Sequence, residues 1–269
     1  MPTTFQYVSD IHTEMYNALP KDVYSFPFTP LAPYLILAGD IGYPFHKNYY
    51  QFLSQLSPLF ERIFIIAGNH EYYQTKYDLV KAAATAEAPG KSWIAAVDAR
   101  IRQAANSFDN VTFLQNESYD IPDTNLTVFG GTFWSEILPE EQDSVRRSLA
   151  DYRYIPQFTP QKSRELFQTS VQALQVALVA KPERNFVVIS HHLPSYTLIA
   201  DQYKNIEPPI NSAFASEIPE AQNPQIKAWV AGHTHTPIEL GKFHVNPFGY
   251  PMEAKRQSAS FNKTFTVEE

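Results

Sequence analysis

Residues 63–71 read Ile-Phe-Ile-Ile-Ala-Gly-Asn-His-Glu, an apolar, β-rich run that ends in a polar cluster. The same arrangement recurs at four other short apolar runs, at residues 5–8, 35–38, 186–189 and 228–231. Each of these runs is followed closely by Asp or His. Open α/β sheets build their sites at the carboxyl ends of strands, because the loops there converge on one edge. We therefore expect an α/β fold with a functional site at such an edge.

The polar clusters follow one another in the order Asp10-Ile-His12, Gly39-Asp40, Gly68-Asn69-His70-Glu71, His191-His192 and Gly232-His233-Thr-His235. Their first two spacings are regular, because Asp10 and Asp40 are 30 residues apart and Asp40 and Asn69 are 29 apart. One strand–helix–strand unit takes roughly 30 residues. Three successive loops would therefore deliver polar side chains to the same edge of a sheet.

These residue types suit a pair of metal ions. Two cations about 3.5–4 Å apart need a bridging carboxylate, neutral imidazoles and further anionic oxygen, and Asp40 is the natural bridge. Imidazole suits Zn and Fe while carboxylate and amide oxygens suit Mn, so this mixed set favours Mn, Fe or Zn.

Taken singly, each cluster has another explanation. An Asp-x-His pair is common on solvated surfaces, Gly-Asp is ordinary turn chemistry, and Asn69 could cap a helix. The adjacent His191 and His192 could be a structural pair. The five clusters together, in one order and each at a strand end, favour the metal centre.

In this order, the clusters resemble the sequence pattern of the calcineurin-like metallophosphoesterases. The resemblance implies a four-layer α/β/β/α sandwich of two stacked mixed sheets flanked by helices. It implies that one metal is held by Asp10, His12, Asp40 and His235, and the other by Asp40, Asn69, His191 and His233. It also implies that His70 is not a ligand and assists catalysis at the phosphoryl group. Of the adjacent histidines, we expect His191 to be the ligand because it directly follows the strand, and His192 to line the pocket or orient a ligand.

Further stretches are similar to features of a subgroup of small, mostly uncharacterised phosphoesterases, namely 131–134, 151–153 and 246–250. That subgroup commonly shows Leu-Trp-Thr-Asp where this chain reads Phe-Trp-Ser-Glu at residues 133–136, a departure that bears on substrate preference. We expect Arg153 and Tyr152 to contact substrate, because a guanidinium forks onto phosphate oxygens. A surface salt bridge would explain the arginine equally well.

Composition sets the remaining bounds. The chain has 269 residues, 44% of them hydrophobic, which is enough for one α/β domain over residues 1–269. The absence of Cys removes disulfides and thiolate ligands and fits a reducing compartment. With no signal sequence and no apolar run of 18 residues, we expect a cytoplasmic protein without a membrane partner. The net charge of −7 disfavours nucleic acid as a partner.

The intervening segments predict the rest of an α/β fold. Apolar side chains recur at helical spacing over 46–60 and 163–180, and residues 111–114, 126–130 and 242–245 are typical of further strands. So many strands favour two stacked sheets. The proline-rich stretches 16–33 and 193–224 are expected either to border the metal centre or to be ordinary surface loops.

The predicted function is metal-dependent hydrolysis of a phosphomonoester or phosphodiester in a small substrate. Two cations lower the pKa of a shared water, and the hydroxide attacks phosphorus in line. His70 would then support the leaving oxygen. Two alternatives are a catalytically silent scaffold of the same fold and a nuclease, the latter disfavoured by charge.

Overall fold

The computed structural model describes residues 2–16, 29–74, 92–257 and 261–268. Its first sheet has five strands in the order β11-β1-β2-β3-β4. Their bounds are β1 Thr3–Val8, β2 Tyr34–Ala38, β3 Arg62–Ile66, β4 Val111–Phe113 and β11 Thr264–Val267. Strands β1 to β4 are parallel, and β11 pairs antiparallel with β1. The loops after β1, β2 and β3, which carry the predicted ligands, therefore leave the same edge, as the regular spacing predicted.

The second sheet has six strands in the order β5-β6-β7-β8-β10-β9. Their bounds are β5 Glu117–Asp120, β6 Leu126–Gly130, β7 Asn185–Ile189, β8 Ile226–Ala231, β9 Ile238–Leu240 and β10 Phe243–Val245. The inner strands β6, β7, β8 and β10 are parallel, and the edge strands β5 and β9 are antiparallel to their neighbours. Both sheets are therefore mixed.

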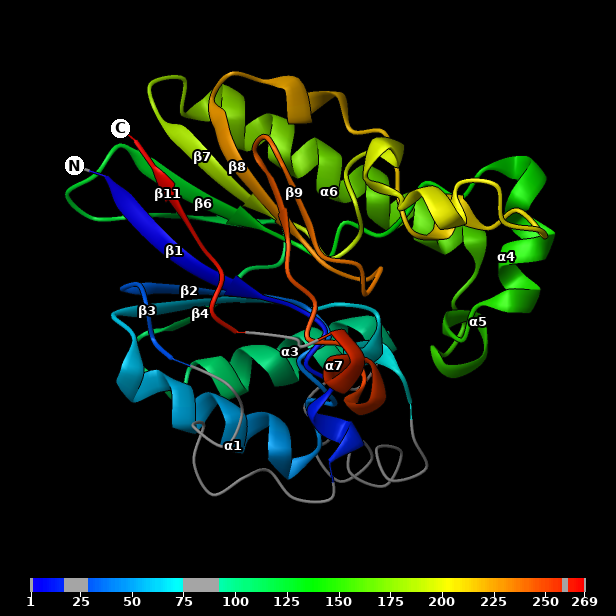
Figure 1. Ribbon diagram of the computed structural model, residues 1–269, viewed down its shortest axis with the longest axis horizontal. Coiled ribbons are helices and arrows are strands. Elements are labelled where there is room, and N and C mark those ends of the chain that lie inside the picture. The colour runs from blue at the N-terminus through cyan, green and yellow to red at the C-terminus, as the bar shows by residue number, and fades with distance from the viewer. Residues whose placement is uncertain (1, 17–28, 75–91, 258–260, 269) are drawn as a thin grey trace.

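The two sheets stack face to face with helices on their outer sides (Figure 1). Successive side chains of a strand point to opposite faces. Ile36 of β2 packs between the sheets, whereas Leu35 and Leu37 pack in the outer cluster beside α1 (Lys47–Leu56) and α3 (Trp93–Ala105). On the other side, Val188 and Trp229 pack under α6 (Pro160–Ala180). Strands buried on both faces become almost entirely apolar, which is why they were recognisable in the sequence.

The predicted helices form where their apolar periodicity placed them. Helix α1 begins after His46 and continues into a 3-10 turn, Ser57–Leu59. Helix α6 begins at Pro160, and the Thr159 side chain accepts a hydrogen bond from the Lys162 amide. Helices α3, α4 (Gln142–Ser148), α5 (Asp151–Tyr154) and α7 (Pro251–Gln257), and strands β5, β9 and β11, were not predicted.

One end of the molecule carries α4, α5 and the segment 196–214, which lie together in Figure 1. The Ser212 amide donates to Glu141 Oε2 at 2.9 Å, and Val145 of α4 packs against Ala213. Part of the proline-rich stretch 16–33 that was expected to border the site, residues 17–28, lies outside the described residues. Among the helices that the structure describes, none has the length and apolar character to cross a membrane.

Candidate metal centre

Backbone strain marks the loops at the sheet edges. The backbone is left-handed at five of the ligand candidates, with φ of 55° at Asp10, 53° at His12, 52° at Asp40, 72° at His233 and 50° at His235. Residues other than glycine rarely adopt such angles, and those that do cluster at functional sites. These five residues follow the ends of β1, β2 and β8, so the strain lies at the edge where the sequence predicted a site.

A first group of donor atoms gathers around Asp10. His12 Nε2 lies 3.2 Å from His235 Nε2, which in turn lies 3.4 Å from Asp10 Oδ1. His12 Nε2 is also 3.8 Å from Asp40 Oδ2. These atoms surround one small volume, as the ligands of a single metal ion do.

A second group gathers around His191. Its Nε2 atom lies 3.1 Å from Asn69 Oδ1 and 3.4 Å from Asp40 Oδ2. The His233 ring is 5.1 Å from the His191 ring, and His233 Nε2 is buried with no hydrogen-bond partner among the described residues. Burial and the neighbouring His191 lower the pKa of His233 to about 3. An unpaired, buried nitrogen on a neutral imidazole is costly unless something binds it, and it therefore fits a metal ligand.

Asp40 reaches both groups. Its Oδ2 atom is near His12 on one side and His191 on the other. Donor atoms of Asp10, His12 and His235 lie within 4.8 Å of one another, as do those of Asp10, Asp40 and His191. This mixture of imidazole nitrogen and carboxylate oxygen fits two adjacent cations, with Asp40 between them.

Hydrogen bonds fix the orientation of three of the imidazoles. Each donates from Nδ1 to a protein oxygen: His12 to Glu14 Oε1 at 3.1 Å, His191 to the Ala38 carbonyl at 2.9 Å, and His235 to Glu253 Oε2 at 2.6 Å. A hydrogen bond of this kind sets the tautomer and makes Nε2 the nitrogen that faces the other donor atoms.

Asp151 orients the amide of Asn69. Its Oδ1 atom accepts hydrogen bonds from Asn69 Nδ2 at 2.8 Å and from the Tyr73 hydroxyl at 2.6 Å. The Asn69 oxygen is thereby turned toward His191. Asn69 does not cap the 3-10 turn that follows it, because its side chain makes no capping hydrogen bond there.

His70 lies beside the ligand candidates. Its Nδ1 donates to Glu14 Oε1 at 3.3 Å, its ring stacks on Tyr73 at 4.3 Å, and its Nε2 is 3.3 Å from the Tyr250 hydroxyl. Burial lowers the pKa of His70, but the carboxylates of Asp40 and Glu14 outweigh burial and hold it above the ordinary value. A raised pKa favours the protonated ring, which can donate a hydrogen bond from Nε2.

The adjacent histidines face different surroundings. The side chain of His191 enters the site, whereas His192 points its ring toward Trp134 at 5.6 Å and His233 at 4.2 Å. His192 Nδ1 lies 3.5 Å from the Thr132 carbonyl. Burial, with His233 and His191 nearby, lowers its pKa well below the ordinary value. His192 is therefore placed to support His233, and it does not line the cavity described below.

The two predicted substrate contacts separate in the structure. Arg153 is exposed on α5 and lines the cavity, with Nη1 donating to the Arg147 carbonyl at 3.3 Å. Tyr152 stacks on Phe158 at 5.5 Å and packs against the core, away from the cavity lining. Neighbouring residues of a short helix point in different directions, so the two side chains could not both face the site.

The Glu71 side chain links the loop after β2 to the loop after β3 through hydrogen bonds to their backbone. Its two oxygens accept hydrogen bonds from four backbone N–H groups, those of Asp40 (3.0 Å), Ile41 (2.7 Å), Gly42 (3.3 Å) and Gly68 (2.8 Å). Sequence reasoning assigned no role to Glu71, nor to Glu14, Asp151, Tyr250 or Glu253. An unusually buried carboxylate is visible only once the fold is known.

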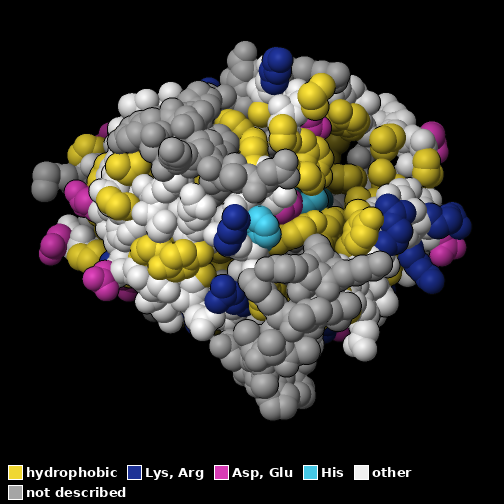
Figure 2. Space-filling model, turned by 90° about the horizontal axis from the view of Figure 1, so that it is seen from below, with side chains coloured by type: hydrophobic (Ala, Val, Ile, Leu, Met, Phe, Trp, Pro, Cys, Tyr) yellow, Lys and Arg dark blue, Asp and Glu magenta, His cyan; other side chains and the backbone are white. Residues whose placement is uncertain are grey.

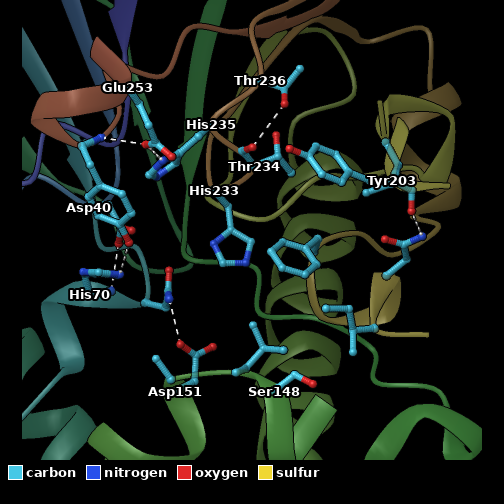
Figure 3. A pocket seen from close by; sticks show the side chains of 18 of the residues that line it. Asp40, His70, Ser148, Asp151, Tyr203, His233, Thr234, His235, Thr236 and Glu253 are labelled. Atoms are coloured by element: carbon cyan, nitrogen blue, oxygen red, sulfur yellow. Dashed lines mark hydrogen bonds and ion pairs between the residues drawn. The ribbon is translucent and has the colours of Figure 1, made fainter. Parts of the chain in front are cut away.

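A cavity of about 810 Å³ opens from the donor cluster. In Figure 3, Asp40, His70, His235 and Glu253 lie on one side, Tyr203 lies on the other, and His233 lies between them. Seen from below, hydrophobic side chains border a hollow in which histidine and acidic side chains appear (Figure 2). Segment 199–214, part of the second proline-rich stretch, lines this cavity together with the candidate ligands Asp40, Asn69, His233 and His235.

The whole arrangement can be compared with known proteins. Residues 4–237 match the family model of the calcineurin-like phosphoesterases. The chain belongs to this family. Membership confirms the predicted family and supports hydrolysis of phosphate esters as the general class of reaction.

Individual proteins are similar to this chain in sequence or in fold. An uncharacterised protein of Acanthamoeba polyphaga mimivirus is 26% identical over 257 residues, which cover 86% of this chain and 84% of the relative. The crystal structure of the phosphopantetheinyl hydrolase PptH from Mycobacterium tuberculosis is similar with a TM-score of 0.70 at 16% identity, covering 98% of this chain and 95% of that one. The protein TT1561 of Thermus thermophilus gives a TM-score of 0.54 at 12% identity, covering 100% and 99%. These structures show that the fold is shared.

Proposed function

We propose that this protein is a metal-dependent phosphoesterase with a pair of metal ions, most suitably Mn, Fe or Zn, that hydrolyses a phosphomonoester or phosphodiester. The observation that carries the proposal is the buried, unpaired Nε2 of His233 beside a converging set of imidazole and carboxylate donors. The ions would be held by Asp10, His12, Asp40 and His235 on one side and by Asp40, Asn69, His191 and His233 on the other. When bound, such a pair offsets charge on the phosphoryl group and favours ionisation of the attacking water.

The protein's own groups contribute at the leaving oxygen. His70 lines the cavity and keeps its Nδ1 engaged with Glu14, so its Nε2 edge is the one that can meet substrate. In this proposal His70 donates a proton or a hydrogen bond as charge builds on the leaving oxygen. The Tyr250 hydroxyl, 3.3 Å from Nε2, holds the ring in that orientation. Arg153 at the cavity rim would contact the phosphate ester or its substituent.

The direct test is turnover of 4-nitrophenyl phosphate and bis(4-nitrophenyl) phosphate by protein loaded with Mn²⁺ and by protein treated with EDTA. Hydrolysis of either ester that is lost with EDTA and restored by Mn²⁺ supports the proposal. If the protein binds two ions but turns over neither ester, the proposal is contradicted. The alternative of a catalytically silent scaffold would then be favoured. Cleavage of an oligonucleotide in preference to both esters would indicate a nuclease.

His70→Ala should separate catalysis from metal binding. His70 has a ring nitrogen within 4.8 Å of donor atoms of His12 and Asp40, but its hydrogen bonds go to Glu14 and Tyr250 and the proposal gives it no metal. The variant should therefore keep its metal content. Its kcat should fall by roughly 10²–10⁴-fold, the usual worth of a positioned proton donor. The matched control is His244→Ala, which removes a histidine that stacks on Phe265 away from the cavity. Loss of metal in step with activity would show that His70 is a ligand.

A further inference from the structure

The cavity is chemically divided. Its inner end carries the donor cluster and His70, together with the carboxylates of Asp151 and Glu253. Its outer part is lined by segment 199–214 and the chain at the end of α4. The apolar side chains there are Leu149, Ile199, Ile206, Ile210 and Phe214, and the polar ones include Ser148, Gln202 and Asn211. A volume of about 810 Å³ falls within the range of about 300–1,000 Å³ found for pockets that hold drug-sized ligands. A bare phosphate would leave most of it unused.

The apolar wall begins directly at the proposed metal centre. The ring of Phe214 lies 5.0 Å from the ring of His233, with 30° between their planes. A group bonded to a phosphate at the metal centre and directed toward segment 199–214 would therefore pass Phe214. Burying an apolar group against that ring is favourable, whereas burying a charged one there without a partner is costly.

The wall is tied to the scaffold on two sides. The Leu193 amide donates to the Phe214 carbonyl at 3.0 Å, and Leu193 forms a β-bridge with Ala215 just after β7. Ile210 and Phe214 also pack against a small cluster that contains Val145 of α4. A surface held in this way is formed before substrate arrives, so little ordering entropy opposes binding.

Charge is scarce along this wall. Among the described residues that line the cavity, Arg153 is the one Lys or Arg, and it lies exposed at the rim. The acidic lining residues are Asp40, Asp151 and Glu253, which belong to the inner end. A substrate with several charges along its organic part would find no partners beyond Arg153. An uncharged chain would find apolar side chains at Ile199, Ile206, Ile210 and Phe214, with the uncharged polar groups of Gln202 and Asn211 among them.

Resting on the proposed function, we propose that the substrate is a phosphate ester whose organic part is an extended, largely apolar chain. The phosphate lies at the donor cluster, and the chain runs past Phe214 along Ile199, Ile206 and Ile210. In this proposal, segment 199–214 forms the surface that selects the substrate, and its residues take no part in the chemical step.

The test measures binding and turnover separately. Binding of a series of n-alkylphosphonic acids, from methyl to octyl, is followed by titration calorimetry on the Mn²⁺-loaded protein. Turnover is followed with 4-nitrophenyl alkyl phosphates of the same chain lengths, which share one leaving group, and with the n-alkyl phosphates by release of inorganic phosphate. We expect the dissociation constant to fall, and kcat/KM to rise, by about two- to fourfold per added methylene.

Ile206→Ser should reduce the dependence on chain length of both the dissociation constant and kcat/KM. The methyl compounds should stay within about twofold of wild type, because Ile206 lines only the outer part of the cavity. The matched control is Val176→Ser, which removes a side chain that is 63% exposed on α6 and outside the lining; it should leave the slopes unchanged. Ala200→Leu, which fills the cavity, should weaken octyl binding and spare methyl binding.

The outcomes separate this inference from the proposed function. If the affinity for phosphonates is independent of chain length, the apolar subsite is wrong, even where the esters are hydrolysed. If affinity rises with chain length and no ester is turned over, the subsite stands and the phosphoesterase proposal fails. If Val176→Ser reduced the gain in affinity per methylene as much as Ile206→Ser does, the assignment would also be wrong, because the effect would not be specific to segment 199–214.

Discussion

The Asp151 carboxylate decides which atom of Asn69 faces the donor cluster. It holds the amide nitrogen at 2.8 Å, and the remaining oxygen is directed toward His191. An amide at position 151 could turn an N–H group toward Asn69 and release this constraint. The orientation of a proposed ligand therefore depends on a residue that touches no metal.

Asp151→Asn should weaken binding at the site that contains Asn69 by about 10–100-fold, the usual cost of losing a group that orients a ligand. The first site should keep its affinity. Titration of the metal-free protein with Mn²⁺, read by calorimetry, resolves the two steps. The control Asp143→Asn alters an exposed carboxylate on α4. Two unchanged binding steps in Asp151→Asn would mean that Asn69 is positioned by something else.

At the residue scale, the sequence predicted the candidate metal ligands better than the residues that orient those ligands. Asp40 and His191 follow strand ends in a recognisable order, so their convergence follows from topology. Asp151 lies 82 residues from Asn69 along the chain, and no local pattern reveals that pairing. Tyr152 was expected in the substrate site because of its neighbours, but its ring packs in the core.

Helix α3 carries a titratable group that makes stability depend on pH. Burial raises the pKa of Asp98 to about 6, against the opposing hydrogen bond from the Tyr72 hydroxyl at 2.6 Å. The folded protein therefore binds a proton more tightly than the unfolded chain, whose aspartate titrates at about 3.9. Stability from this group is complete below about pH 4 and is lost as the pH rises through about 6.

Asp98→Asn should remove that dependence. Relative to the variant, wild-type protein should lose free energy of unfolding between about pH 4 and pH 7, by up to about 3 kcal/mol for a shift of roughly two pKa units. Urea unfolding of the metal-free proteins at pH 4.5 and pH 7 measures the difference. The control Asp109→Asn changes an exposed aspartate just after the same helix. A stability gap between wild type and Asp98→Asn that is the same at both pH values would contradict the assignment.

At the element scale, most of the strands that the sequence predicted correctly are buried on both faces. Strands β2, β3, β7 and β8 are covered on both faces, so their apolar runs were visible in the sequence. Strand β5 is an edge strand whose residues are mostly exposed, and edge strands of this kind carry polar residues. Helices α4, α5 and α7 have seven residues or fewer, which is too short to show a clear 3.6-residue period.

The site exists only because two sheets meet. Asp10, Asp40 and Asn69 follow strands of the first sheet, whereas His191 and His233 follow strands of the second. The approach is close: a Cβ at Gly39, where φ is +85°, would lie 2.5 Å from His191 Nδ1. The Gly in the Gly39-Asp40 cluster thus allows the loop of one sheet to pass beside the histidine of the other.

The stacking of two sheets was predicted from the number of strands and from family resemblance, and the structure confirms it. The division of the cavity into an inner end with the candidate ligands and an outer part along segment 199–214 could not be predicted in the same way. Segment 199–214 lacks long regular elements. Neither the 3.6-residue period of a helix nor the two-residue period of a strand could therefore predict which of its side chains face the cavity. Its path over the site follows from tertiary contacts with Leu193 and α4.

The central claim is that Asp40 joins two metal ions in one centre. The most direct measurement is the metal content of wild type, Asp40→Ala and the control Asp143→Ala, loaded with Mn²⁺, desalted and analysed by inductively coupled plasma mass spectrometry. We predict two ions per chain in wild type and in the control, and at most one in Asp40→Ala, because the variant loses the carboxylate that lies between His12 and His191. Two ions per chain in folded Asp40→Ala, or none in wild type, would contradict the account.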